Sequence, residues 1–287
     1  MKKFKIFIEL TRLNKPIGYM LLFWPCSWGL AIASYYEQTI NNFYFYLILF
    51  FLGSILMRSA GCIFNDIVDR DIDRKVERTR KRPLASKKLS LKLAFFYIFI
   101  LCLIALLILL QFNYLTVFLG LGSMFLAFTY PFMKRLTYWP QLFLGITFNW
   151  GIIMAWTAIT NQISMEIFML YTAAIFWTLG YDTIYGLQDI KDDEIIGMKS
   201  TSIKFKNYTK LFVSICYIIN SLIIMYIFQK FLGFNFFSFM ALIYLFTLIF
   251  QVYHFNKNSP KKCLAAFKLN NFSGLTLFIC IFSLQIY

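Results

Sequence analysis

The chain consists of long apolar stretches separated by short polar connections. These stretches lack the polar stripe of a surface helix, and residues 93–110 contain no charged side chain at all. A helix rises about 1.5 Å per residue, so roughly 20 apolar residues cross the hydrocarbon core of a bilayer. We therefore predict an all-α, polytopic membrane protein with about nine transmembrane helices. The predicted spans are residues 17–35, 43–64, 93–110, 114–132, 141–159, 165–186, 210–229, 235–254 and 270–287.

The basic residues fall in alternate connections between these spans. All but two of the 28 lysines and arginines precede the first span or lie between spans two and three, four and five, six and seven, or eight and nine. The exceptions are Arg58, inside the second span, and Lys230. Because cytoplasmic loops accumulate Lys and Arg, this alternation supports the span count and predicts a cytoplasmic amino terminus.

Composition narrows the class of protein further. The chain is 60% hydrophobic and only 14% charged, and we expect residues 1–287 to form one transmembrane domain. The distribution of the basic residues over alternate connections explains the net charge of +15 by membrane orientation, so we expect no nucleic-acid partner. The six cysteines contain no CxxC pair and His254 is the only histidine, which excludes a zinc site and a metal centre built on several histidines.

The acidic residues are concentrated in two short segments. Five of the 13 lie in residues 66–77 and five more in residues 182–194. Each segment lies at the end of an even-numbered span, so both emerge on the same side of the membrane. Two acidic segments on one side can converge on one polyanion if metal ions bridge the charges.

The spacing within each segment favours a metal site. If the second span continues as a helix, Asn65, Asp69 and Asp73 share one helical face, and Asp189 and Asp193 repeat the four-residue spacing. Carboxylates at this spacing repel one another, and a divalent cation offsets the repulsion. Oxygen ligands of this kind suit Mg²⁺, which binds through a few carboxylates together with substrate phosphates. We therefore predict that these five residues are metal ligands.

Arg58 is a second candidate functional residue because a charge inside a transmembrane span is costly and is usually functional. Lys134 and Arg135 lie on the same predicted membrane side as the acidic segments. There are two alternatives for them: they only set the membrane topology, or they bind the substrate. Aromatic rings there, such as those of Tyr130 and Tyr185, are suited to stabilise a cation.

The two acidic segments belong to two longer motifs. The motifs are Asn65-Asp66-x-x-Asp69-x-x-x-Asp73 followed by Arg78-Thr79-x-x-Arg82-Pro83-Leu84, and Tyr181-Asp182-Thr183-x-Tyr185-Gly186-x-x-Asp189 followed by Gly197-x-Lys199-Ser200-Thr201. They resemble the signatures of the UbiA superfamily of intramembrane prenyltransferases. The similarity extends over essentially the whole chain, including the opening residues 12–25. The resemblance is strongest to those members that prenylate 4-hydroxybenzoate in the ubiquinone pathway.

The resemblance implies a fold and a set of roles. It implies nine helices around a central cavity, a lateral opening to membrane lipid, Mg²⁺, a polyprenyl diphosphate donor and 4-hydroxybenzoate as acceptor. It places metal–diphosphate segments at residues 58–86 and 181–201. The catalytic residues expected on this basis are Arg58, Asp66, Lys134 and Asp182, and the substrate-binding residues are Arg58, Arg82, Lys134, Tyr185 and Lys199.

The chemistry implied is loss of diphosphate to give an allylic cation, followed by attack of the ring carbon ortho to the phenol hydroxyl. The expected location is the bacterial inner membrane, with the active-site loops in the cytoplasm. Alternatives are another acceptor, such as a naphthoate, homogentisate or haem, and a cation-coupled transporter, which would place acidic residues nearer the bilayer midplane. The sequence sets neither the prenyl chain length nor the oligomeric state.

Overall fold

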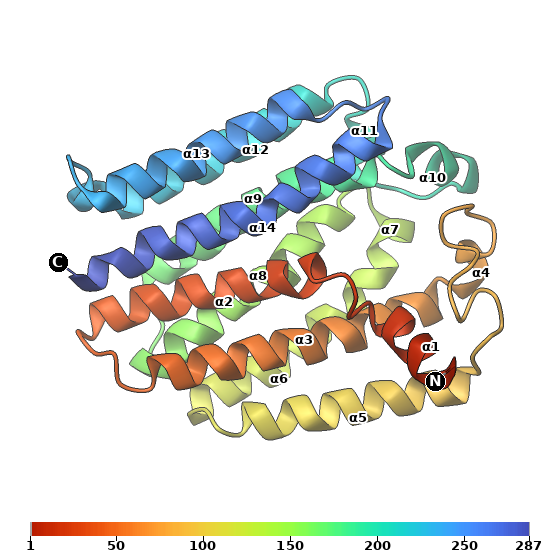
Figure 1. Ribbon diagram of the computed structural model, residues 1–287, viewed down its shortest axis with the longest axis horizontal. Coiled ribbons are helices and arrows are strands. Elements are labelled where there is room, and N and C mark those ends of the chain that lie inside the picture. Colours follow the sequence, from red (N-terminus) through yellow and green to blue (C-terminus); the bar gives the residue numbers. More distant parts are fainter. Residues whose placement is uncertain (1, 287) are drawn as a thin grey trace.

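The computed structural model describes residues 2–286, and within that range it is built from helices without strands. Nine of the described helical segments are long and apolar enough to cross a membrane. They run roughly side by side (Figure 1). Their helices are α2 (Ile17–Tyr36), α3 (Phe43–Val68), α5 (Leu91–Leu109), α6 (Tyr114–Thr129), α8 (Pro140–Thr160), α9 (Met165–Gly186), α12 (Thr209–Ile227), α13 (Phe236–His254) and α14 (Pro260–Phe282).

The all-helical prediction is confirmed, and eight of the predicted spans match these helices to within a few residues. The ninth was predicted at residues 270–287, but α14 begins ten residues earlier, at Pro260. Proline suits the first turn of a helix, and Lys261 and Lys268 are exposed while Cys263 and Phe267 are buried. The apolar pattern therefore missed an amphipathic first section. Tyr287, the last residue of the predicted span, lies outside the described residues.

Short helices gather at one end of the molecule, at the right of Figure 1. Among them is α1 (Lys2–Thr11), which the search for long apolar spans did not identify. It packs along α3, with Leu10 fully buried and the Phe7 ring 5.1 Å from that of Tyr97. The other short segments near this end are α4 (Arg70–Asp73), η1 (Tyr130–Phe132), α7 (Met133–Leu136), α10 (Ile190–Ile196) and α11 (Thr201–Lys204).

The second span continues farther than predicted, and this extension positions the first acidic segment. Helix α3 ends at Val68, and Asp69 joins it to α4. The Asp69 amide donates to the Asn65 carbonyl at 2.9 Å, and the Asp73 amide donates to the Asp69 carbonyl at 2.8 Å. These bonds keep the helical register across the junction, so the three side chains share a face as the spacing predicted.

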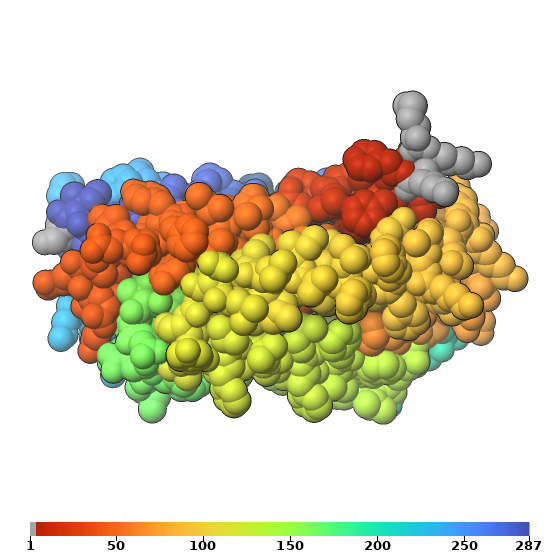
Figure 2. All heavy atoms as spheres, turned by 90° about the horizontal axis from the view of Figure 1, so that it is seen from below, coloured from red at the N-terminus to blue at the C-terminus, as the bar shows by residue number. Residues whose placement is uncertain are grey.

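The transmembrane helices pack through small residues and buried polar pairs. A Cβ atom on Gly29 of α2 would lie 2.5 Å from the Ile152 carbonyl oxygen of α8, so only glycine permits this approach. In the half of the molecule formed by α9 and α12–α14, the Trp177 indole donates to Asn270 at 2.8 Å, and Asn270 donates to Gln251 at 2.8 Å. Helix α5 instead lies at the surface, where it runs across the face shown in Figure 2.

Candidate active site

A cavity of about 2250 Å³ opens at the end of the molecule where the short helices gather. It continues between α2, α3, α5, α6 and α8, where its walls are mainly apolar. Every site residue predicted from the sequence lines it: Arg58, Asn65, Asp66, Asp69, Asp73, Arg82, Lys134, Asp182, Tyr185, Asp189, Asp193 and Lys199. The fold thus brings both acidic segments to one compartment.

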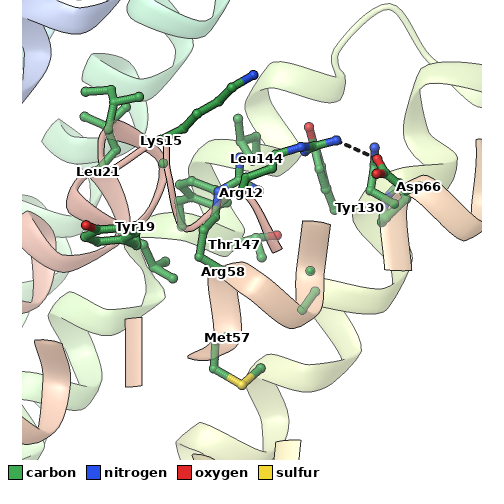
Figure 3. Close-up of a pocket in the computed structure, with 18 of the residues that line it drawn as sticks. Arg12, Lys15, Tyr19, Leu21, Met57, Arg58, Asp66, Tyr130, Leu144 and Thr147 are labelled. Atoms are coloured by element: carbon green, nitrogen blue, oxygen red, sulfur yellow. Dashed lines mark hydrogen bonds and ion pairs between the residues drawn. The ribbon is translucent and has the colours of Figure 1, made fainter. Parts of the chain in front are cut away.

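Buried carboxylates of the first acidic segment are paired with arginines from elsewhere in the chain. Asp66, at the end of α3, accepts from Arg12 at 2.5 Å and from Arg82 at 3.1 Å (Figure 3 shows the Arg12 contact). The same Arg82 nitrogen donates to Asp73 at 2.8 Å. Arg12 directly follows α1, whereas Arg82 lies in the connection between α4 and α5, so this charge cluster fixes two segments over the cavity.

Asp69 is held from the opposite side of the cavity. Its carboxylate pairs with the Lys134 ammonium, and Arg135 lies 3.5 Å from its other oxygen. Both basic residues belong to α7, which the Tyr130–Phe132 turn directs back toward α3. Burial raises the pKa of Asp69 above its usual range, and the neighbouring Lys134 ammonium opposes that rise.

The second acidic segment is joined to the first half of the chain by Arg78. This arginine donates to both carboxylate oxygens of Asp189, with the Nε–Oδ1 contact at 2.6 Å. Asp193 forms no ion pair within the described residues. Burial raises the pKa of Asp193 to about 6, and the Asp189 carboxylate adds to the rise. The nearby Lys134 and Arg78 charges oppose this rise, although neither forms an ion pair with Asp193 in the described structure.

The donor chemistry around this end of the cavity fits a hard divalent cation. One amide oxygen, from Asn65, and four carboxylates, from Asp69, Asp73, Asp189 and Asp193, line the same compartment. Within residues 2–286, no three acidic, histidine or cysteine side chains lie close enough together to hold a metal ion. In the described structure, arginine and lysine side chains offset the repulsion between these carboxylates, a role that the sequence pattern led us to assign to a metal ion.

Arg58 and Asp182 lie deeper, in a less polar part of the cavity. The Arg58 guanidinium stands 5.5 Å from the centre of the Phe148 ring, and its buried Nε has no hydrogen-bond partner in the described structure. A Cβ atom on Gly18 would lie 2.9 Å from that nitrogen. Arg58 and Thr147 line the same cavity and are drawn in Figure 3, so an arginine without an ion pair in the described structure stands in a partly apolar pocket that can accept a small anion.

The remaining predicted residues line the cavity in different ways. The Tyr185 ring packs 4.5 Å from Phe267 and lies under the Arg78 guanidinium, so it forms part of the wall beside the second acidic segment. The Lys199 ammonium donates to the Leu136 carbonyl at 3.2 Å, which ties it to the end of α7. In the described structure Lys199 therefore braces α7 and pairs with no carboxylate.

Sequence reasoning assigned no role to Arg12 or Arg78, although both contact the acidic segments. Arg78 belongs to the first motif, and its place shortly after the acidic positions could have indicated a contact with an acidic segment. For Arg12 the signal was its place between an amphipathic segment and the first span.

The chain is similar to known proteins over most of its length. Residues 22–273 match the UbiA prenyltransferase family. It is 38% identical over 275 residues to 4-hydroxybenzoate octaprenyltransferase of Pseudomonas fluorescens (strain Pf0-1), covering 96% of this chain and 92% of that one. It is 44% identical over 209 residues to the mitochondrial 4-hydroxybenzoate polyprenyltransferase of Rattus norvegicus, covering 72% of this chain and only 55% of the relative.

Solved structures show the same fold. The apo structure of a UbiA homologue from Aeropyrum pernix K1 has a TM-score of 0.77 at 24% identity and covers 92% of this chain and 97% of that one. A UbiA homologue from Archaeoglobus fulgidus, solved with GPP and Mg²⁺, has a TM-score of 0.68 at 15% identity and covers 97% of this chain and 99% of that one. The match over residues 22–273 and the similarity to the bacterial relative over nearly its whole length show that the chain belongs to the UbiA prenyltransferase family.

Proposed function

We propose that this integral membrane protein transfers a polyprenyl group from its diphosphate to the ring carbon ortho to the hydroxyl of 4-hydroxybenzoate. The observation that carries the proposal is one cavity with a charged end, an isolated arginine and a long apolar extension. The names of the similar full-length bacterial proteins support the choice of acceptor. Both acidic segments line this cavity, which supports treating residues 1–287 as one functional domain.

The charged end binds the diphosphate of the donor in this proposal. Asn65, Asp69, Asp73, Asp189 and Asp193 would hold Mg²⁺, which would supply positive charge against the leaving diphosphate. The basic residues that line the cavity beside them bind the diphosphate oxygens, and these are Arg78, Arg82 and Lys134. Pairing with carboxylates orients these basic groups before the donor arrives.

The prenyl chain occupies the apolar extension between α5, α6 and α8. Gly120 of α6 lies at a narrow point, where an added Cβ atom would lie 2.5 Å from a Leu109 methyl group and 3.0 Å from the Met154 methyl group. The allylic carbon then lies near the charged end, with the chain away from water. A dry compartment protects the allylic cation from capture by water.

The acceptor occupies the pocket at Arg58. Its carboxylate pairs with the Arg58 guanidinium, which forms no ion pair in the described structure, and its ring faces the allylic carbon. The C–O bond of the donor breaks with its electron pair on the diphosphate oxygen, and the ring carbon bonds to the cation. Asp182, which lines the same cavity without an ion pair in residues 2–286, then accepts the ring proton.

The orientation follows from charge. Most basic residues lie in the chain segments that carry or adjoin the short helices and acidic segments, whereas Lys230 lies in the α12–α13 connection. Because lysine and arginine remain on the cytoplasmic side, we place the active site and amino terminus in the cytoplasm and the protein in the bacterial inner membrane.

Product formation tests the proposal as a whole. Purified protein in detergent, given Mg²⁺, a polyprenyl diphosphate and 4-hydroxybenzoate, should form prenylated 4-hydroxybenzoate, and a chelator should abolish the product until Mg²⁺ is restored. A parallel panel should contain a hydroxynaphthoate and homogentisate. Prenylation of one of these instead of 4-hydroxybenzoate would disprove the acceptor, and the absence of any product and of diphosphate release from folded protein would disprove prenyl transfer.

Neighbouring carboxylates provide a matched test of the metal ligands. Asp69→Asn and Asp189→Asn should each lower kcat by about 100-fold or more, because each removes an anionic ligand that stabilises charge in the transition state. Asp71→Asn removes an equal charge two residues from Asp69, but its side chain is 72% exposed and faces away from the cavity lining, so kcat should change little. Equal losses in all three variants would contradict the assignment.

Arg58 should act on the acceptor and not on the donor. Arg58→Gln should raise the KM for 4-hydroxybenzoate about 10- to 100-fold, the value expected for loss of a charged hydrogen bond worth about 1.5–3 kcal/mol. Arg82→Gln should instead raise the KM for the diphosphate. Steady-state kinetics with each substrate varied in turn separates the two effects. A rise confined to the donor KM in Arg58→Gln would show that Arg58 belongs to the diphosphate site.

A further inference from the structure

A second hollow, of about 670 Å³, lies apart from the central cavity at the beginning of α5. None of the residues that line it also lines the central cavity. Basic side chains dominate its wall, and its lining consists of Arg70, Arg74, Leu84, Lys87, Leu89, Ser90, Leu91 and Lys92. Prenyl transfer as described above uses none of them.

The charges around this hollow are unbalanced. Asp71 is the acidic side chain that pairs with its wall, at 2.9 Å from Arg74 and 3.4 Å from Arg70. Lys87 and Lys92 form no ion pair within the described residues. The Arg74 Nε also donates to the Ala85 carbonyl at 3.0 Å, so its side chain is held in place. The hollow therefore has a fixed excess of positive charge.

Helix α5 adds to this positive potential. It has 19 residues and begins at Leu91, in the wall of the hollow, with Ser90 as its N-cap. The Ser90 hydroxyl accepts from the Leu93 amide at 3.3 Å. The amino end of a helix carries partial positive charge, which favours an anion in addition to the four basic side chains.

The surface beyond the hollow is apolar and faces lipid. Only 17% of the α5 span is buried inside the molecule, the same low share as in the fourth span. Phe95, Phe96 and Phe99 are exposed within the first turns of α5. Figure 2 shows α5 running along the surface directly into the loop that forms the hollow. The hollow thus lies where a transmembrane helix leaves the membrane, at the level of lipid headgroups.

We propose that this hollow binds the phosphate-bearing headgroup of an anionic phospholipid. The phosphate lies among Arg70, Arg74, Lys87 and Lys92, and the acyl chains lie along the exposed phenylalanines of α5. A basic pocket at the cytoplasmic end of a transmembrane helix provides both parts of such a ligand with a complementary surface. A free phosphate would use the charges and leave the adjoining apolar surface unused.

The matched variants are two double substitutions that remove the same charge. Lys87→Gln with Lys92→Gln changes the hollow, whereas Lys257→Gln with Lys261→Gln changes two exposed lysines beside the start of α14 that line neither cavity. All four side chains are exposed, so both proteins should fold as the parent does. Native mass spectrometry of the purified full chain then measures retained phosphatidylglycerol against phosphatidylcholine with the same acyl chains.

The parent protein and the α14 control should retain phosphatidylglycerol in preference to phosphatidylcholine, and the hollow variant should bind it about 10- to 30-fold more weakly. Inorganic phosphate, at an ionic strength matched with chloride, should not displace the lipid. Equal retention by the two double variants would overturn the proposal. Displacement by inorganic phosphate would overturn it as well, because the hollow would then be a site for a free anion.

Discussion

The site depends on the compensation of buried negative charge. Asp66, Asp69 and Asp73 are almost completely buried at one end of a helical bundle, where water cannot screen their repulsion. Arg12, Arg82 and α7 provide the opposing charge, each from a different part of the chain. These pairs fix the amino-terminal helix, the α4–α5 connection and α7 around the cavity mouth. Prenyl transfer, as proposed, needs the same charges for the metal and the diphosphate.

The ion pairs of the site can also exchange partners when the substrate binds. Arg78 bridges to Asp189, so the two acidic segments are already joined without a ligand. In the proposed reaction, the carboxylates would pair with the divalent cation and the basic groups with the diphosphate, with little change in total charge. Few buried charges are then left without a partner before or after the substrate binds. This favours the arrangement because a buried charge without a partner is strongly destabilising.

Much of the fold followed from local patterns. Apolar runs of about 20 residues identified the spans because the bilayer sets their length. The four-residue spacing placed Asn65, Asp69 and Asp73 on one face because the helical register continues from α3 across Asp69 into α4. The pairs Arg12–Asp66 and Arg78–Asp189 join residues 54 and 111 positions apart, so periodicity could not reveal them. The amphipathic start of α14 was missed because its lysines interrupt the apolar run.

Prenyl transfer as proposed requires both acidic segments to hold one metal–diphosphate complex. The most direct measurement is anomalous scattering from crystals grown with Mn²⁺ in place of Mg²⁺ and an unreactive prenyl thiodiphosphate. Manganese should lie between the Asp69–Asp73 face and the Asp189–Asp193 face, and Arg78 should have moved from Asp189 to the diphosphate. Manganese bound elsewhere, or a diphosphate bound while Arg78 stays on Asp189 and no metal contacts either face, would contradict it.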